Sequence, residues 1–181
     1  MGETARILII DDDENIRKVL ATILEEEGYI VETADTAKTA IQKTGRKFYN
    51  LALIDIRLPD MEGIELLTKI KPTTPKMRKI LVTGFPTMQN AVDAVNRGAD
   101  GYILKPFNVG KVLKIIEEQL KKQEEEKEYN QNKVVEFIET RVREIDLEET
   151  VHTKKLRPSS SMFFGTFYSS LSYNFVILKL R

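Results

Sequence analysis

The sequence predicts an α/β fold, a doubly wound five-stranded parallel sheet with helices on both faces. Apolar runs of residues that favour β-strands alternate about five times along the chain with segments whose apolar residues have helical spacing. Strands joined through helices have right-handed crossovers, which gives a parallel sheet that is buried on both faces. The length of 181 residues, of which 41% are hydrophobic and 31% charged, suits one compact domain plus an appendage.

Two periodicities predict the individual elements. Continuous apolar runs indicate strands near residues 6–10, 29–33, 51–54, 79–82 and 101–104. Apolar residues three and four positions apart indicate helices near residues 16–27, 37–44, 64–70, 88–96 and from 109 onward. Gly28 suits the end of the first helix, and Lys71-Pro72 the end of the third. About five βα units in this order are typical of the flavodoxin-like doubly wound fold.

Beyond residue 121 the composition changes. Glu117 to Glu128 is almost wholly charged or polar yet rich in helix formers, so the fifth helix is expected to run on. Val135, Ile138, Val142 and Ile145 then recur at steps of three and four. Two interpretations stay open, a helix that folds back onto the domain and a dimerising helix. The predicted divisions are an α/β domain (1–121), a charged helical extension (122–150) and a tail (151–181).

The tail is aromatic and rich in serine. Met162 to Leu178 carries no charge, but Ser, Thr and Tyr interrupt it, and it is shorter than the about 20 apolar residues of a spanning helix. No transmembrane segment is therefore expected. A hairpin, a partner-binding tail and an irregular extension remain open.

Composition excludes several functional classes. Lys and Arg number 28, as do Asp and Glu, so no global positive field exists to hold a nucleic acid. The chain has no cysteine, which excludes disulfides, thiolate metal sites and a cysteine nucleophile. The first residues lack the apolar core of a signal peptide, which favours a cytoplasmic protein.

Polar residues that suit a phosphoryl site follow four of the predicted strands. Ligands of an open parallel sheet bind in the crevice outside the carboxyl ends of the strands, so these side chains are expected to converge in one pocket. They are Asp11 and Asp12 after the first strand, Asp55 after the third, Thr83 after the fourth and Lys105 after the fifth. Asp13 is left out, because a carboxylate there suits the start of the first helix.

The residue types of this pocket indicate an aspartyl phosphate. Clustered carboxylates suit Mg²⁺, which takes few protein ligands beside a phosphate. A carboxylate can attack phosphorus if the metal and a cation offset the negative charge, and Lys105 can supply that cation. The Thr83 hydroxyl need only donate a hydrogen bond to a phosphoryl oxygen.

Four motifs occur in a fixed order and spacing. They are Leu8 to Asp13, Asp55 with Pro59 and Gly63, Val82-Thr83-Gly84, and Lys105-Pro106-Phe107. Together they resemble the response-regulator receiver domain, the CheY-like family, over roughly residues 5–121. The resemblance implies two-component signal transduction, with the chain catalysing only its own phosphorylation and dephosphorylation.

The resemblance also implies a role for each site residue. Asp55 corresponds to the phosphoacceptor, and the ligands of Mg²⁺ would be Asp11, Asp12, Asp55 and the backbone carbonyl of Arg57. Thr83 and Tyr102 correspond to the switch residues. Lys105 would contact the phosphate, aimed by a cis Lys105–Pro106 peptide bond.

The partners implied are a phosphoryl donor and a downstream protein. The donor would be a histidine kinase or a phosphotransfer protein, because His152 is the only histidine of the chain and is remote from every motif. Phosphorylation is expected to shift the conformation of the face formed by the fourth helix, fifth strand and fifth helix, which a downstream protein then binds. No DNA-binding domain is evident in residues 122–181.

Two alternatives also fit parts of the sequence. Asp11-Asp12-Asp13 also fits the D-x-D nucleophile motif of haloacid-dehalogenase-like phosphohydrolases, with Asp11 as nucleophile, but that assignment leaves Asp55 unexplained. The second keeps the receiver and makes the C-terminal part a dimerisation or membrane-surface effector, so a homodimer remains possible.

Overall fold

The computed structural model describes residues 4–84 and 86–155, so residues 156–181 of the predicted tail lie outside the described part. The strands are β1 (Arg6–Ile10), β2 (Ile30–Ala34), β3 (Leu51–Asp55), β4 (Arg78–Thr83) and β5 (Gly101–Leu104). The helices are α1 (Glu14–Glu26), α2 (Ala37–Arg46), α3 (Gly63–Lys69), α4 (Met88–Asn96) and α5 (Val109–Lys155). The strands pair in parallel in the order β2-β1-β3-β4-β5, which confirms the predicted doubly wound fold.

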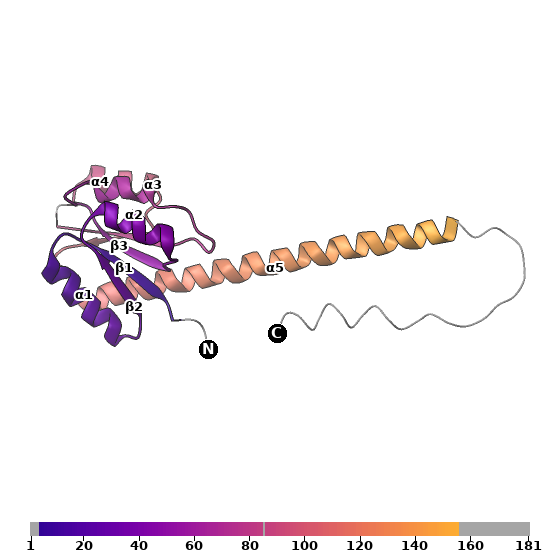
Figure 1. Ribbon diagram of the computed structural model, residues 1–181, viewed down its shortest axis with the longest axis horizontal. Helices are drawn as coiled ribbons and strands as arrows, with labels where there is room; N and C mark the ends of the chain where they lie inside the picture. The colour runs from indigo at the N-terminus through magenta and orange to yellow at the C-terminus, as the bar shows by residue number, and fades with distance from the viewer. Residues whose placement is uncertain (1–3, 85, 156–181) are drawn as a thin grey trace, which may run out of the picture. The chain divides into compact units, whose positions relative to one another are not determined.

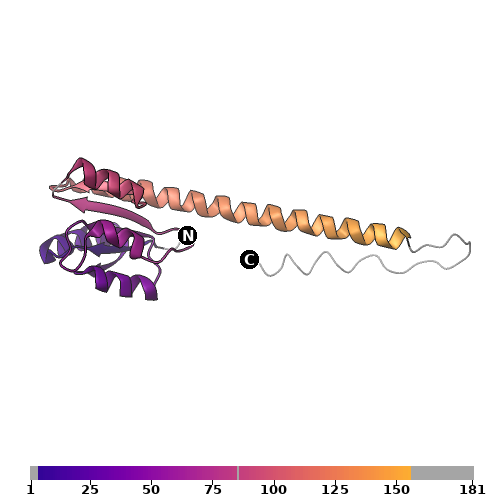
Figure 2. The same cartoon turned by 90° about the horizontal axis from the view of Figure 1, so that it is seen from above.

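The sheet is buried on both faces. Side chains alternate along a strand, so Leu8 and Ile10 of β1 enter one apolar core and Ile7 and Ile9 the other, each at most 1% exposed. Helices α2, α3 and α4 cover the first face, and α1 and the first turns of α5 cover the second (Figure 1). In Figure 2, α4 and the start of α5 flank the same edge of the sheet, where β5 lies.

Local hydrogen bonds and glycines fix where the helices begin and end. The Asp13 carboxylate accepts hydrogen bonds from the backbone N–H groups of Asn15 at 2.8 Å and Ile16 at 3.3 Å, so Asp13 caps α1, as expected. Gly28 and Gly98 follow α1 and α4 with φ of 87° and 81°. This left-handed conformation favours glycine and ends each helix.

Helix α5 confirms the predicted extended C-terminal helix. The chain divides into two units, Met1–Val135 and Glu136–Arg181. The predicted divisions at residues 121 and 150 stay predictions. No helix within residues 4–84 and 86–155 is long and apolar enough to cross a membrane.

A polar contact holds α5 against the N-terminal end of the sheet. Gln123, 3% exposed, donates from its side-chain amide to the backbone carbonyls of Asn50 at 2.9 Å and Lys76 at 2.6 Å. The Asn50 side-chain amide donates in return to the Gln123 carbonyl oxygen at 3.0 Å. Buried polar groups cost free energy unless they are hydrogen-bonded, so this reciprocal pair fixes the position of residue 123. The contact lies beyond the predicted end of the α/β domain at residue 121.

Candidate functional site

Asp55 is the last residue of β3 and is 7% exposed. Its Oδ1 accepts a hydrogen bond from the Lys105 ammonium at 2.7 Å, and its Oδ2 accepts one from the backbone N–H of Arg57 at 2.7 Å. Lys105 directly follows β5, which lies on the far side of β4. The fold therefore joins two of the predicted strand-end residues in one ion pair.

Asp11 directly follows β1 and is 3% exposed. Its Oδ2 accepts a second hydrogen bond from the Lys105 ammonium, also at 2.7 Å, and its Oδ1 accepts one from the backbone N–H of Asp13 at 3.0 Å. Lys105 thus bridges carboxylates from the ends of β1 and β3. Asp12 is exposed at the rim of this cluster, as is Arg57.

Burial and ion pairing oppose each other in this cluster. Burial raises the pKa of the Asp55 carboxyl, and the hydrogen bond from Lys105 offsets only part of that rise. Burial alone would lower the pKa of Lys105, but its hydrogen bonds to Asp11 and Asp55 outweigh burial and raise the pKa. Lys105 is therefore held as an ammonium beside a carboxylate that is more basic than usual.

Of the other predicted residues, Thr83 ends β4, and Tyr102 is the second residue of β5. Thr83 is 1% exposed, and its carbonyl accepts a hydrogen bond from the Lys105 backbone N–H at 2.7 Å. The Lys105–Pro106 peptide bond is cis, as the resemblance implied. Tyr102 of β5 has a buried hydroxyl with no hydrogen-bond partner among the described residues, and burial raises its pKa.

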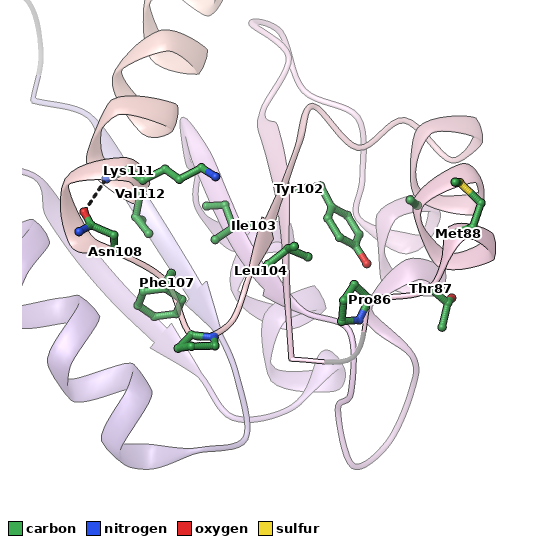
Figure 3. Close-up of a pocket in the computed structure, with 12 residues that line it drawn as sticks. Pro86, Thr87, Met88, Tyr102, Ile103, Leu104, Phe107, Asn108, Lys111 and Val112 are labelled. Carbon is green, nitrogen blue, oxygen red and sulfur yellow. Dashed lines mark hydrogen bonds between the residues drawn. The ribbon is translucent and has the colours of Figure 1, made fainter.

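A pocket of about 670 Å³ lies beside Tyr102, between α4, β5 and the start of α5. Figure 3 shows the tyrosine ring directed toward Pro86 and Thr87, just before α4. Pro106 also lines this pocket, so the pocket begins one residue from Lys105. A movement of Lys105 in the acidic cluster therefore reaches the α4–β5–α5 face through the adjacent residue Pro106.

Gly63, the first residue of α3, lies against the backbone of Asp55. A Cβ at position 63 would overlap the Asp55 carbonyl oxygen and lie 2.9 Å from the Asp55 carbonyl carbon. The Gly63 N–H also donates to the Ile56 carbonyl at 2.8 Å. In the sequence Gly63 is one residue of a family motif, and the structure supplies the physical reason for it: only glycine lets α3 begin this close to β3.

The acidic residues fit the chemistry of Mg²⁺. No three carboxylate, histidine or cysteine side chains within residues 4–84 and 86–155 are placed to hold a metal ion by themselves. Mg²⁺ commonly takes one or two carboxylates and completes its octahedron with waters and phosphate oxygens. A buried carboxylate on Asp11 with an exposed one on Asp12 suits that smaller requirement.

Residues 7–117 match the family model of the response regulator receiver domain. The chain belongs to this family. Its members are two-component regulators that signal through phosphorylation, receive the phosphoryl group from histidine kinases and generally use Mg²⁺. The match and the strand order agree with the receiver fold expected from the sequence.

Three known proteins illustrate how far this similarity reaches. A CheY-like receiver domain from Methanospirillum hungatei JF-1 is 50% identical, with 68% of this chain and 99% of that chain covered and a TM-score of 0.66. The beryllofluoride-activated NtrC4 receiver domain dimer is 35% identical, with 65% and 98% covered and a TM-score of 0.62. Regulatory protein AtoC of Escherichia coli (strain K12) is 32% identical over 68% of this chain but only 27% of AtoC. The chain therefore spans about a quarter of AtoC, and that similarity concerns the receiver.

Proposed function

We propose that Asp55 accepts a phosphoryl group from a histidine kinase or a phosphotransfer protein, and that the receiver then signals to a protein partner from the cytoplasm. The supporting observation is the Lys105 ammonium, 2.7 Å from the carboxylates of both Asp11 and Asp55. It puts a fixed positive charge where the oxygens of an incoming phosphoryl group gather negative charge.

The transfer forms one bond as another breaks. An Asp55 carboxylate oxygen bonds to phosphorus, the P–N bond of the donor phosphohistidine breaks, and the departing imidazole takes up a proton. Mg²⁺, when bound, neutralises charge on the phosphoryl oxygens and orients them. Asp11, Asp12, Asp55 and the Arg57 carbonyl are the residues that would hold it.

Lys105 and Thr83 stabilise the product in this proposal. Lys105 exchanges its contact with Asp55 for one with a phosphoryl oxygen, while Asp11 keeps the ammonium in place. Thr83 ends the strand beside β3, since Val82 pairs with Asp55, so its hydroxyl is within a short movement of the phosphoryl group. The hydroxyl donates a hydrogen bond to that group.

Tyr102 carries the change to the α4–β5–α5 face in this proposal. A buried hydroxyl without a partner costs about 1–3 kcal/mol, so the ring position is weakly held and can be exchanged for another. Movement of Thr83 toward the phosphoryl group leaves room for the ring to follow. The pocket beside Tyr102 then changes shape, and a partner selects the phosphorylated conformation.

Replacing the acceptor tests this proposal. Asp55→Asn is expected to abolish phosphorylation by acetyl phosphate, whereas Asp11→Asn should slow phosphorylation while the modification remains on Asp55. Mass spectrometry of the intact chain and of its peptides measures both, with circular dichroism to confirm that each variant folds. Modification of Asp11 in the Asp55→Asn variant would instead support the phosphohydrolase alternative.

A homodimer built through α5 is a second candidate for the output. In the second unit Ile138, Val142 and Ile145 recur at steps of four and three and are each at least 50% exposed. Apolar residues with this spacing are typical of a helix that packs against another helix. Light scattering on the full chain and on a chain that ends at Val135, with and without beryllofluoride, is expected to show a dimer only with the full chain. The same number of chains per particle for both would contradict it.

A further inference from the structure

We propose that Arg17 is a positioning residue for Mg²⁺ binding, because it holds the loop that carries Asp11 and Asp12 in the conformation that the metal needs. This inference rests on the proposed function. Arg17 lies in the second turn of α1, and its Nη1 donates a hydrogen bond to the backbone carbonyl of Asp11 at 2.7 Å. Side chains of a helix lean toward its N-terminus, which lets Arg17 reach back to that loop.

Arg17 completes a set of contacts that leaves Asp11 little freedom. The Asp11 N–H donates to the carbonyl of Ala34 at 3.2 Å, which ties the residue to β2. Its Oδ1 accepts from Asp13 and its Oδ2 from Lys105. Of these polar groups of Asp11, the carbonyl is the one that is hydrogen-bonded to a residue of α1, namely Arg17. Without that bond, the peptide that joins Asp11 to Asp12 loses a hydrogen bond that ties it to α1.

The geometry of this bond requires arginine. A guanidinium is planar and always charged, and it donates in fixed directions from the end of a long stem. A hydrogen bond from such a group to a carbonyl is stronger than a neutral one. Lysine keeps the charge, but its ammonium is a compact group at the end of a flexible side chain. It therefore does not reproduce the directed hydrogen bond of the guanidinium.

Two effects of Arg17 on Mg²⁺ binding have opposite signs. Holding the loop favours binding, since loss of residues that orient metal ligands typically weakens metal affinity about 10–100-fold. The positive charge of Arg17 disfavours binding by repelling a cation, but solvent and salt weaken charge repulsion near a protein surface. We therefore expect positioning to dominate, and the sign of the change in affinity separates the two effects.

The test compares Arg17→Met and Arg17→Lys with Lys18→Met in the full chain. The Lys18→Met substitution removes the same charge from the adjacent position of α1. In the described structure the exposed Lys18 side chain pairs only with Glu14, at 2.7 Å. The Mg²⁺ dissociation constant is measured from the backbone amide NMR shifts of residues 11–13. Both Arg17 variants are expected to bind Mg²⁺ about tenfold more weakly, and Lys18→Met should match the native chain.

The phosphorylation rate gives a second measurement. With acetyl phosphate as donor, the Arg17 variants should need about tenfold more Mg²⁺ for half-maximal rate and reach nearly the native rate at saturation. Native or tighter Mg²⁺ affinity in the Arg17 variants would overturn the inference. If Arg17→Met does not fold, Arg17→Lys decides by the same criterion. Failure of the native chain to bind Mg²⁺ or form an aspartyl phosphate would refute the proposed function itself.

Discussion

Gly63→Ala is expected to destabilise the receiver by about 2–3 kcal/mol and to slow phosphorylation by about 100-fold. The new methyl group overlaps the carbonyl oxygen of Asp55 and lies 3.0 Å from Cγ2 of Ile54. Asp55 cannot move aside easily, because β3 pairs with β1 on one side and β4 on the other. Either α3 or the end of β3 must shift, and a shift at Asp55 moves the acceptor away from Lys105.

Gly45→Ala is the matched control for this substitution. Gly45 lies within α2, and a Cβ there meets no atom within 4 Å. Alanine is the better helix former by about 1 kcal/mol, so this variant should be as stable as the native chain or more stable. Urea denaturation followed by tyrosine fluorescence gives the unfolding free energies, and acetyl phosphate gives the rates. A Gly63→Ala variant with native stability and native rate would show that the close approach at Asp55 is unimportant.

Most of the fold could be predicted because each element has a local signal. β5 begins and ends as predicted, and α4 does so too. The strand predicted near residues 29–33 is one residue early, since β2 runs from Ile30 to Ala34. Tyr29 instead packs beside the core between α1 and β2, as its partial burial indicates. Apolar character alone does not show whether a residue pairs in a strand or only packs beside it, so element boundaries are predicted less accurately than the elements themselves.

The acidic site could also be predicted in outline, since a parallel sheet brings the carboxyl ends of its strands to one edge. That rule predicts that Asp11, Asp55 and Lys105 lie together. It did not predict that one ammonium bridges both carboxylates, because such a bridge depends on the path of the Lys105 side chain. The roles of these residues in phosphoryl transfer remain proposals.

Contacts made by long side chains or by α5 could not be predicted. Arg17 appears in the sequence as one more charged residue of an amphipathic helix, and only the fold shows that it reaches the Asp11 carbonyl. Gln123 meets Asn50 across 73 positions of sequence. Such pairs have no periodic signal, because they depend on how α5 lies against the ends of β3 and β4. The sequence pattern consequently indicates no role for Asn50 or Gln123.

Asp100 likewise has no signal in the sequence, although it lies at the centre of a charged cluster at the N-terminal end of the sheet. Its Oδ1 contacts Lys76 at 2.8 Å and Arg78 at 3.1 Å, and its Oδ2 accepts from the Lys79 N–H at 3.0 Å. Arg78 is 6% exposed in its side chain and also pairs with Glu126 of α5 at 2.8 Å. Asp100 thus compensates a buried cation that joins β4 to α5.

Asp100→Asn is expected to lower the free energy of unfolding by about 3 kcal/mol at pH 7, because it removes the buried carboxylate beside Arg78 and leaves only the exposed Glu126 to pair with it. Burial raises the pKa of Asp100, but hydrogen bonds from Lys76 and the Lys79 N–H outweigh burial and lower it. A lowered folded-state pKa gives stability that is present above the unfolded pKa of about 4 and is lost as the pH falls through the folded value. Urea denaturation between pH 3 and pH 8 should therefore show the stabilities of the native chain and the variant converging below about pH 4.

Glu118→Gln, which removes an exposed charge from α5, is the control and should change stability by less than about 0.5 kcal/mol. An Asp100→Asn deficit that stays constant down to pH 3 would mean that the Asp100 charge does not stabilise the fold.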